Sequence, residues 1–245
     1  ISHLHGDHCL GLMGLLSTFG MLGRMSDLTI HAHPDIEKLF GTQIKYFCAD
    51  APYKIIFAPF DPRKVETIYE DRAVAVKTLP LKHTVPTCGF LFEEKPLPRH
   101  LNKQMCDAWE VPVAEYKNLI VGADYVTPAG EVVENARLTF EPTPSKRFAY
   151  MSDTAYSESC LDLIKGVDLL YHEATYLSSV DAVKLKTRMH SSAAQAAELA
   201  RKAAVRKLVI GHYSSTYKDV KVFEDEAREI FQESYGAKDG ETFWF

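Results

Sequence analysis

The sequence His3-Leu4-His5-Gly6-Asp7-His8 places three imidazoles and one carboxylate within a single short segment. Side chains of an extended chain alternate between two faces, so we expect His3 and His5 to point the same way. Gly6 permits a sharp turn of the backbone, after which Asp7 and His8 can reach a second centre. Because imidazole suits zinc and carboxylate suits harder ions, the segment predicts two neighbouring divalent metal ions, with zinc the leading candidate.

The composition is that of an ordinary globular protein. The 245 residues fit one large domain better than two, and 46% are hydrophobic. The formal net charge is −5, so a polyanionic partner would need a local basic patch. No apolar run approaches the roughly 18 residues of a membrane span, and no signal peptide is visible. These features predict a protein without a membrane partner.

The five cysteines are scattered along the chain without CxxC spacing. This distribution predicts free thiols in a reducing cytoplasm. Cys9 directly follows His8, but free cysteine is usually a small buried hydrophobe, so we expect it to pack in the core. The chain starts at Ile1, immediately before the metal segment, which normally follows a strand. We therefore expect N-terminal strands to be missing from this chain.

Hydrophobic periodicity predicts strands in the first half of the chain and strands alternating with helices in the second, which favours an α/β sandwich. Residues 9–23 are apolar on nearly every side and predict a buried helix. Further helices are expected at 191–207 and 219–235, and a final strand at 242–245. Residues 95–142 are proline-rich and lack a strong period, so we expect an excursion or reduced substrate-binding arm within a single domain spanning 1–245.

Polar side chains follow the apolar strands expected downstream, at the point where each strand ends. They are His83, Asp153, His172 with Glu173, and His212. Loops at strand ends are where α/β proteins place their chemistry, so we expect these groups to converge on the opening segment. We leave open whether His172 is functional or a buried structural histidine. The other histidines His31, His33 and His100 fit no ligand pattern.

Counting ligands predicts a two-metal site. The expected ligands are His3, His5 and His83 for one ion, Asp7, His8 and His212 for the other, and Asp153 as a bridge. Two ions about 3.5–4 Å apart can share a hydroxide that is nucleophilic near neutral pH. We expect two Zn²⁺ per chain, although Mn²⁺ and Fe²⁺ tolerate the same ligands.

The complete set of ligands resembles that of the metallo-β-lactamase superfamily. Three further segments resemble ribonuclease Z, the tRNA 3′-processing endonuclease. They are His172-Glu173-Ala174-Thr175-Tyr176, His190-Ser191-Ser192-Ala193-Ala194-Gln195-Ala196-Ala197 and Gly211-His212-Tyr213-Ser214-Ser215-Thr216-Tyr217. The resemblance covers most of the chain outside residues 95–142.

The resemblance implies a four-layer αββα sandwich, usually a homodimer, that acts as a zinc-dependent hydrolase. Its expected reaction is removal of 3′ trailers from precursor tRNA by a di-zinc-activated hydroxide, leaving a 3′-hydroxyl. It also assigns Glu173 and His190 to a catalytic pair near the metals. A histidine held by a carboxylate can protonate a departing alkoxide, and Asp7 could orient or deprotonate the attacking water.

Two features depart from the family pattern. Residues 110–117 lack the Gly-Pro motif of the family's RNA-binding arm, and residues 95–142 hold five basic against seven acidic residues. Thr216 stands where the family often has arginine. One alternative is therefore another hydrolase of the same fold, acting on a small phosphodiester, arylsulfate, lactone or thioester. The second is a non-enzymatic RNA-binding protein with a vestigial site, and the function of Ser214 and Ser215 stays open.

Overall fold

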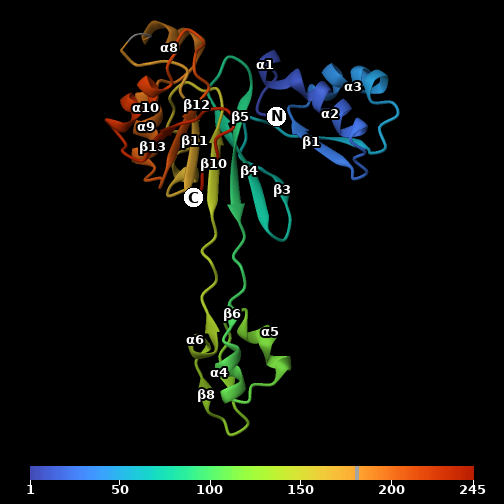
Figure 1. The fold of residues 1–245 in the computed structure, drawn as a ribbon, viewed down its shortest axis with the longest axis vertical. Coiled ribbons are helices and arrows are strands. Elements are labelled where there is room, and N and C mark those ends of the chain that lie inside the picture. The colour runs from blue at the N-terminus through green and yellow to red at the C-terminus, as the bar shows by residue number, and fades with distance from the viewer. Residues whose placement is uncertain (180–181) are drawn as a thin grey trace. The chain divides into compact units, whose positions relative to one another are not determined.

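The computed structural model describes residues 1–179 and 182–245 (Figure 1). The chain divides into two compact units. The larger unit combines Ile1–Glu93 with Lys146–Phe245, and the smaller unit is Glu94–Ser145. No helix in the described part of the chain is long and apolar enough to cross a membrane.

A seven-stranded sheet forms the centre of the larger unit (Figure 1). Its strands, in spatial order, are β13 (Ser234–Gly236), β12 (Leu208–Gly211), β11 (Leu169–Glu173), β10 (Arg147–Met151), β5 (Thr87–Glu94), β4 (Val74–Leu81) and β3 (Thr67–Glu70). Strands β10 to β13 are parallel to one another, and β5 is antiparallel to β10. Every residue of β12 is buried, as expected for a parallel strand covered on both faces.

Two helices pack against this sheet through small and aromatic side chains. Helix α9 (Ala193–Lys202) begins with a capping box, in which the Ser192 side chain accepts from the Gln195 N–H and the Gln195 side chain accepts from the Ser192 N–H. Its alanine-rich face is fully buried against the neighbouring strands β11 and β12. Helix α10 (Lys221–Arg228) packs on α9 and inserts Phe223 into the same core. The short helices of this part are α7 (Leu161–Ile164) and α8 (Ala182–Arg188).

The N-terminal part of the larger unit has its own apolar cluster. Its elements are α1 (Gly6–Cys9), α2 (Gly11–Met21), β1 (Leu28–Ala32), α3 (Ile36–Phe47) and β2 (Ile55–Pro59). Strands β1 and β2 pair in parallel as a second, two-stranded sheet. Leu16, Ile30 and Phe40 are buried between these elements, together with Cys9. Burial raises the pKa of the Cys9 thiol, and all five cysteines are free.

The α/β class and the large sheet of a metallo-β-lactamase-like fold are confirmed, but three expected elements are wrong. Helix α2 is not buried on every side, because only one face packs on the cluster, and Leu15 and Met21 are exposed. The last helix ends at Arg228 instead of residue 235, because Arg228 donates to the Ser234 carbonyl and the chain returns as β13. The edge strand is therefore at Ser234–Gly236, and residues 242–245 form no strand.

The smaller unit contains the stretch expected as an excursion, and it is built from short elements. They are β6 (His100–Leu101), α4 (Lys103–Ala108), a 3₁₀ helix (Val113–Glu115), α5 (Tyr116–Leu119), β7 (Tyr125–Val126), β8 (Val132–Val133), α6 (Asn135–Leu138) and β9 (Thr139–Phe140). Cys106, Leu119 and Leu138 are fully buried in its own apolar cluster. The Asn135 side-chain amide donates to two backbone carbonyls within the unit. This unit therefore has an independent core.

Candidate metal centre and active site

The elements of the larger unit bring the expected site residues to one place. His3 and His5 precede α1, whose first turn carries Asp7 and His8. Downstream, His83 follows β4, Asp153 follows β10, Glu173 ends β11 and His212 follows β12. Strands β10, β11 and β12 are neighbours and run in the same direction, so their ends share an edge of the sheet, and β4 belongs to the same sheet on the far side of β5.

The first group of possible ligand atoms belongs to His3, His5, His83 and Asp153, which all lie within 4.8 Å of one another. His5 Nδ1 is 3.3 Å from His83 Nε2. Asp153 Oδ2 is 3.8 Å from the Nε2 atoms of both His3 and His83. The His3 Nε2 atom is buried and has no hydrogen-bond partner among the described residues. Its lone pair is therefore available to bind a metal ion.

The second group belongs to Asp7, His8 and His212. His8 Nε2 is 3.5 Å from Asp7 Oδ2 and 3.4 Å from Asp153 Oδ2. The other oxygen of Asp153, Oδ1, is 3.4 Å from His212 Nε2. The Asp153 carboxylate therefore lies between the two groups, as a bridging ligand would.

The donor atoms fit divalent metal ions. Zn–N bonds of 2.0–2.1 Å in a tetrahedron separate neighbouring ligand atoms by about 3.4 Å. The closest contacts within and between the two groups, from 3.3 to 3.5 Å, match that spacing. Burial, with the charges of neighbouring histidines, lowers the pKa of His3 to about 4, and burial also lowers the pKa of His83. Both rings are thus neutral at pH 7, which is the form that binds metal.

The Asp153 carboxylate is ionised in this setting. Burial opposes its ionisation, but the hydrogen bond from His8 and the nearby His212 hold its pKa well below the usual range. The same contact with Asp153 raises the pKa of His8 against the effect of burial. A bridging position between two cations suits a carboxylate that keeps its charge.

In three of the expected histidine ligands, the ring nitrogen that does not face the metal group contacts a neighbouring oxygen. His3 Nδ1 lies 3.1 Å from Ser2 Oγ, His5 Nε2 lies 3.5 Å from Thr84 Oγ1, and His83 Nδ1 lies 3.0 Å from the Met189 carbonyl. Such partners fix the orientation and tautomer of a ligand ring. Met189 holds its carbonyl in place from a left-handed backbone conformation, with φ of 54°.

Glu173 and His190 form a pair beside the two groups. Glu173 is fully buried, and its Oε1 lies 2.8 Å from His190 Nδ1 while also accepting from the Thr154 N–H. Its Oε2 accepts from the N–H and the hydroxyl of Thr175. Burial opposes protonation of His190, but Glu173 outweighs it and raises the pKa of His190 above its ordinary value.

A pocket of about 330 Å³ opens over these residues. It is lined by His5, Asp7, His83, Thr84, Asp153, Thr187, Arg188, His190 and His212. The His190 ring is 5.0 Å from that of His83 and 5.5 Å from that of His212. The expected catalytic histidine therefore shares one pocket with five of the expected metal ligands, His5, Asp7, His83, Asp153 and His212.

Two features of the site were not predicted from sequence. His190 falls into a third group of possible ligands with Asp153 and His212. Thr175 contacts Glu173, His190 and His212 at once, and its place in the His-Glu-Ala-Thr segment was the available signal.

His172 is a buried residue of β11 with Nδ1 2.6 Å from the Glu173 carbonyl, and it belongs to none of the ligand groups found in the described residues.

Comparison with known proteins agrees with this fold. The family model described as "Beta-lactamase superfamily domain" matches residues 124–213. Human tRNase Z, short form, superposes with a TM-score of 0.63 at 19% identity, covering 98% of this chain and 75% of that one. The long-form RNase Z from yeast gives 0.60 at 16% identity, covering 97% of this chain and 31% of that one. At these identities the two structures show the fold alone. These matches show a protein with the metallo-β-lactamase fold.

Relatives identified by sequence show which family within this fold the chain belongs to. Ribonuclease Z of Phocaeicola vulgatus is 48% identical over 239 residues, covering 98% of this chain and 77% of the relative. Ribonuclease Z of Bacteroides thetaiotaomicron is 48% identical, covering 98% and 75%. The chain belongs to the ribonuclease Z family.

Proposed function

We propose that this protein is an endoribonuclease that removes 3′ trailers from tRNA precursors. The observation that carries this proposal is the Glu173–His190 pair, because His190 lines the same pocket as members of both groups of candidate metal ligands. A phosphodiester with a ribose leaving group needs a proton donor as well as a nucleophile. The family relatives named ribonuclease Z support the choice of RNA.

The proposed cofactors are two Zn²⁺ ions per chain, one held by His3, His5 and His83 and one by Asp7, His8 and His212, with Asp153 between them. When bound, such ions supply a nucleophile from water at neutral pH and neutralise phosphate charge. The ligand chemistry also accepts Mn²⁺ or Fe²⁺.

The protein side chains supply orientation and proton transfer. Asp7 is largely exposed and lines the pocket, so one of its oxygens can orient the attacking water. The water oxygen forms a bond to phosphorus while the bond from phosphorus to the 3′ oxygen of the tRNA breaks. His190, protonated and held by Glu173, donates a proton to that departing oxygen. The tRNA then ends in a 3′-hydroxyl, and the trailer carries the phosphate.

Basic residues near the pocket come from α8. Arg188 lines the pocket, and Lys184 and Lys186 lie on the same helix. We propose that this helix meets the RNA backbone. Within the smaller unit several cations are already paired, including Lys103 with Asp107 and Arg99 with Glu141. That unit is therefore a weak phosphate clamp.

We further propose that the protein is a homodimer in the cytoplasm, and that residues 1–245 act as one metallo-β-lactamase-like domain with 94–145 as an inserted arm. The family resemblance supports the dimer, and the five free thiols support a reducing compartment. Size-exclusion chromatography with light scattering tests the dimer.

The test of function is cleavage of a tRNA precursor bearing a 3′ trailer by the purified, zinc-loaded protein. We expect one cut at the trailer junction, a 3′-hydroxyl on the tRNA product and a 5′-phosphate on the trailer. Intact precursor together with hydrolysis of bis(p-nitrophenyl) phosphate would reject the tRNA substrate and leave a phosphodiesterase.

A further inference from the structure

We propose that the Thr175 hydroxyl is a positioning group that joins the metal centre to the Glu173–His190 pair. It would hold His212 for metal binding and Glu173 for proton donation through a single oxygen. This inference rests on the proposed function for the reaction involved. The contacts themselves are independent of the substrate.

The Thr175 hydroxyl lies at the meeting point of three functional side chains. Its Oγ1 is 2.7 Å from Glu173 Oε2, 2.8 Å from His212 Nδ1 and 3.2 Å from His190 Nδ1. Thr175 itself is 6% exposed, so these contacts are shielded from water. Its N–H donates to Glu173, and its carbonyl accepts from the Ser214 N–H. The residue is therefore held between the end of β11 and the loop after β12.

The count of protons determines the direction of each hydrogen bond. A hydroxyl carries one proton and accepts through its lone pairs. The Thr175 hydroxyl donates its proton to Glu173 Oε2. The Thr175 oxygen then has to accept from His212, which places the ring proton of His212 on Nδ1. This leaves the lone pair of His212 on Nε2, the atom that is 3.4 Å from Asp153 Oδ1.

The same arrangement orients His190. Its Nδ1 is closer to Glu173 Oε1, at 2.8 Å, than to the Thr175 hydroxyl. Glu173 therefore accepts the Nδ1–H of His190 with one oxygen and the Thr175 proton with the other. Without the hydroxyl, the buried Oε2 would keep only its backbone donor, and His212 would lose its partner.

Thr175 differs from the groups behind the other ligand rings. Ser2, Thr84 and the Met189 carbonyl each hold a ligand histidine. Among the contacts of the described residues, Thr175 is the one of these partners that also hydrogen-bonds Glu173. A change at Thr175 should therefore alter two measurable properties together, metal affinity and proton donation.

The experiment compares three variants of the full chain. Thr175→Val removes the hydroxyl and keeps the shape, and Thr175→Ser keeps the hydroxyl. Thr78→Val is the matched control, because Thr78 is also a fully buried threonine whose hydroxyl donates to the Lys64 carbonyl and accepts from the Glu66 N–H. Zinc affinity is measured by chelator competition. Rates are measured on a tRNA precursor and on bis(p-nitrophenyl) phosphate, whose leaving group needs no proton.

We expect Thr175→Val to weaken zinc binding by about 10- to 100-fold, the usual effect of losing a partner behind a ligand. We expect it to slow RNA cleavage by a further factor of about 10² relative to the aryl ester, because proton donation is impaired. Thr175→Ser should recover most of both properties, and Thr78→Val should lower the melting temperature only. A Thr175→Val protein with wild-type zinc affinity and an unchanged ratio of the two rates would overturn the proposal.

A second measurement needs no variant. Nitrogen-15 spectra of the wild-type protein with zinc should show the proton of the His212 ring on Nδ1, and a proton on Nε2 would also overturn the proposal. This measurement and the zinc affinities decide the matter even if wild-type protein leaves precursor tRNA intact. That outcome would reject the proposed substrate separately.

Discussion

Glu173 Oε1 lies 2.8 Å from His190 Nδ1, and the Glu173 side chain is fully buried while His190 lines the pocket. Three further donors, the N–H groups of Thr154 and Thr175 and the Thr175 hydroxyl, complete the hydrogen bonding of the carboxylate. The contact with Glu173 raises the pKa of His190 above its ordinary value, although burial opposes this. The pair is thus built to present a protonated imidazole to the pocket.

His190→Ala should lower kcat for RNA cleavage by about 10²- to 10⁴-fold, because the departing 3′ oxygen loses its proton donor. Hydrolysis of bis(p-nitrophenyl) phosphate should fall far less. The rates on both substrates are measured under single-turnover conditions. His33→Ala is the control, since His33 belongs to none of the ligand groups in the described residues. Equal losses on both substrates would contradict a proton-donor function for His190.

Removing the metal should destabilise the protein, because bound ions stabilise only the folded state. The buried His3 Nε2 atom would also be left without a partner. At a metal concentration 100 times Kd the effect is about 3 kcal/mol. Calorimetry with and without chelator measures the shift in Tm.

Asp153→Ala, which removes the group facing both ligand sets, should lower the metal content by more than one ion per chain. Unchanged metal content in that variant would exclude a bridging carboxylate.

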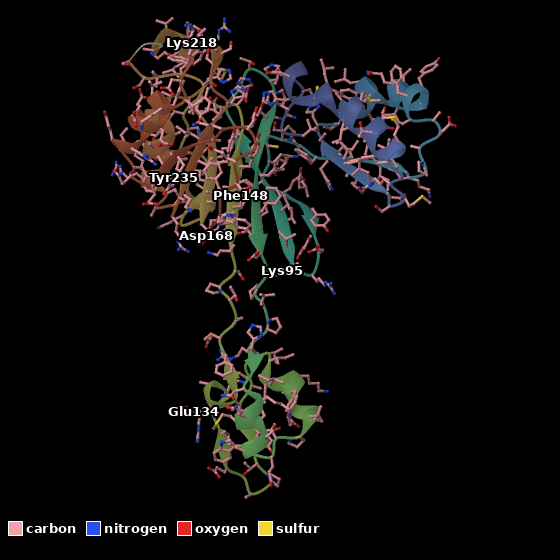
Figure 2. All side chains as sticks on the ribbon, viewed as in Figure 1. Lys95, Glu134, Phe148, Asp168, Lys218 and Tyr235 are labelled. Carbon is pink, nitrogen blue, oxygen red and sulfur yellow. The ribbon has the colours of Figure 1, made fainter. Side chains whose placement is uncertain are left out.

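Asp168, labelled in Figure 2, should make stability depend on pH in the acid range. Burial raises the pKa of Asp168, but hydrogen bonds from the Arg147 N–H and the Arg206 side chain outweigh burial and lower it overall. The carboxylate therefore stabilises the fold above the unfolded pKa of about 4, and this contribution is lost as the pH falls through the folded pKa.

Asp168→Asn should accordingly be less stable than wild type at pH 7 by about 1–2 kcal/mol, and the difference should shrink between about pH 4 and pH 2. Urea titrations across this range measure it. Asp239→Asn, at an exposed position, is the control. A stability difference that stays constant down to pH 2 would show that the charge of Asp168 is not the cause.

The smaller unit should be removable without loss of the metal centre. Glu93 on β5 pairs directly with Arg147 on β10 in antiparallel register, so a two-residue Asn-Gly turn can join the two strands in place of residues 94–146. We expect the shortened protein to fold, bind metal and hydrolyse the aryl ester at wild-type rates. Circular dichroism, metal analysis and kinetics test this.

The same deletion tests what the smaller unit contributes to RNA binding. Residues 95–142 hold more acidic than basic side chains. Removing them should therefore change the slope of log affinity against log salt by less than the amount that one phosphate contact contributes. A much flatter slope in the deletion protein would show that the unit neutralises RNA phosphates after all.

The sequence by itself determined which residues could form the candidate site. The opening His-x-His-x-Asp-His segment is local, and its ligand types and spacing do not depend on the rest of the fold. The remaining donors could be found because apolar strands are easy to recognise, and a polar residue directly after each strand lies at the sheet edge. The identities of Glu173 and His190 came from motifs, and the structure places them together.

Tertiary structure decided the features that depend on packing between distant segments. The contacts of Thr175 with His190 and His212 exist because two loops meet at the edge of the sheet, and no spacing along the chain encodes that meeting. His172 is buried because β11 is an inner strand of the sheet with buried residues on both faces. Likewise, the apolar segment after the metal loop forms a half-exposed helix, and the last strand is Ser234–Gly236, because available neighbours rather than local hydrophobicity set burial and pairing.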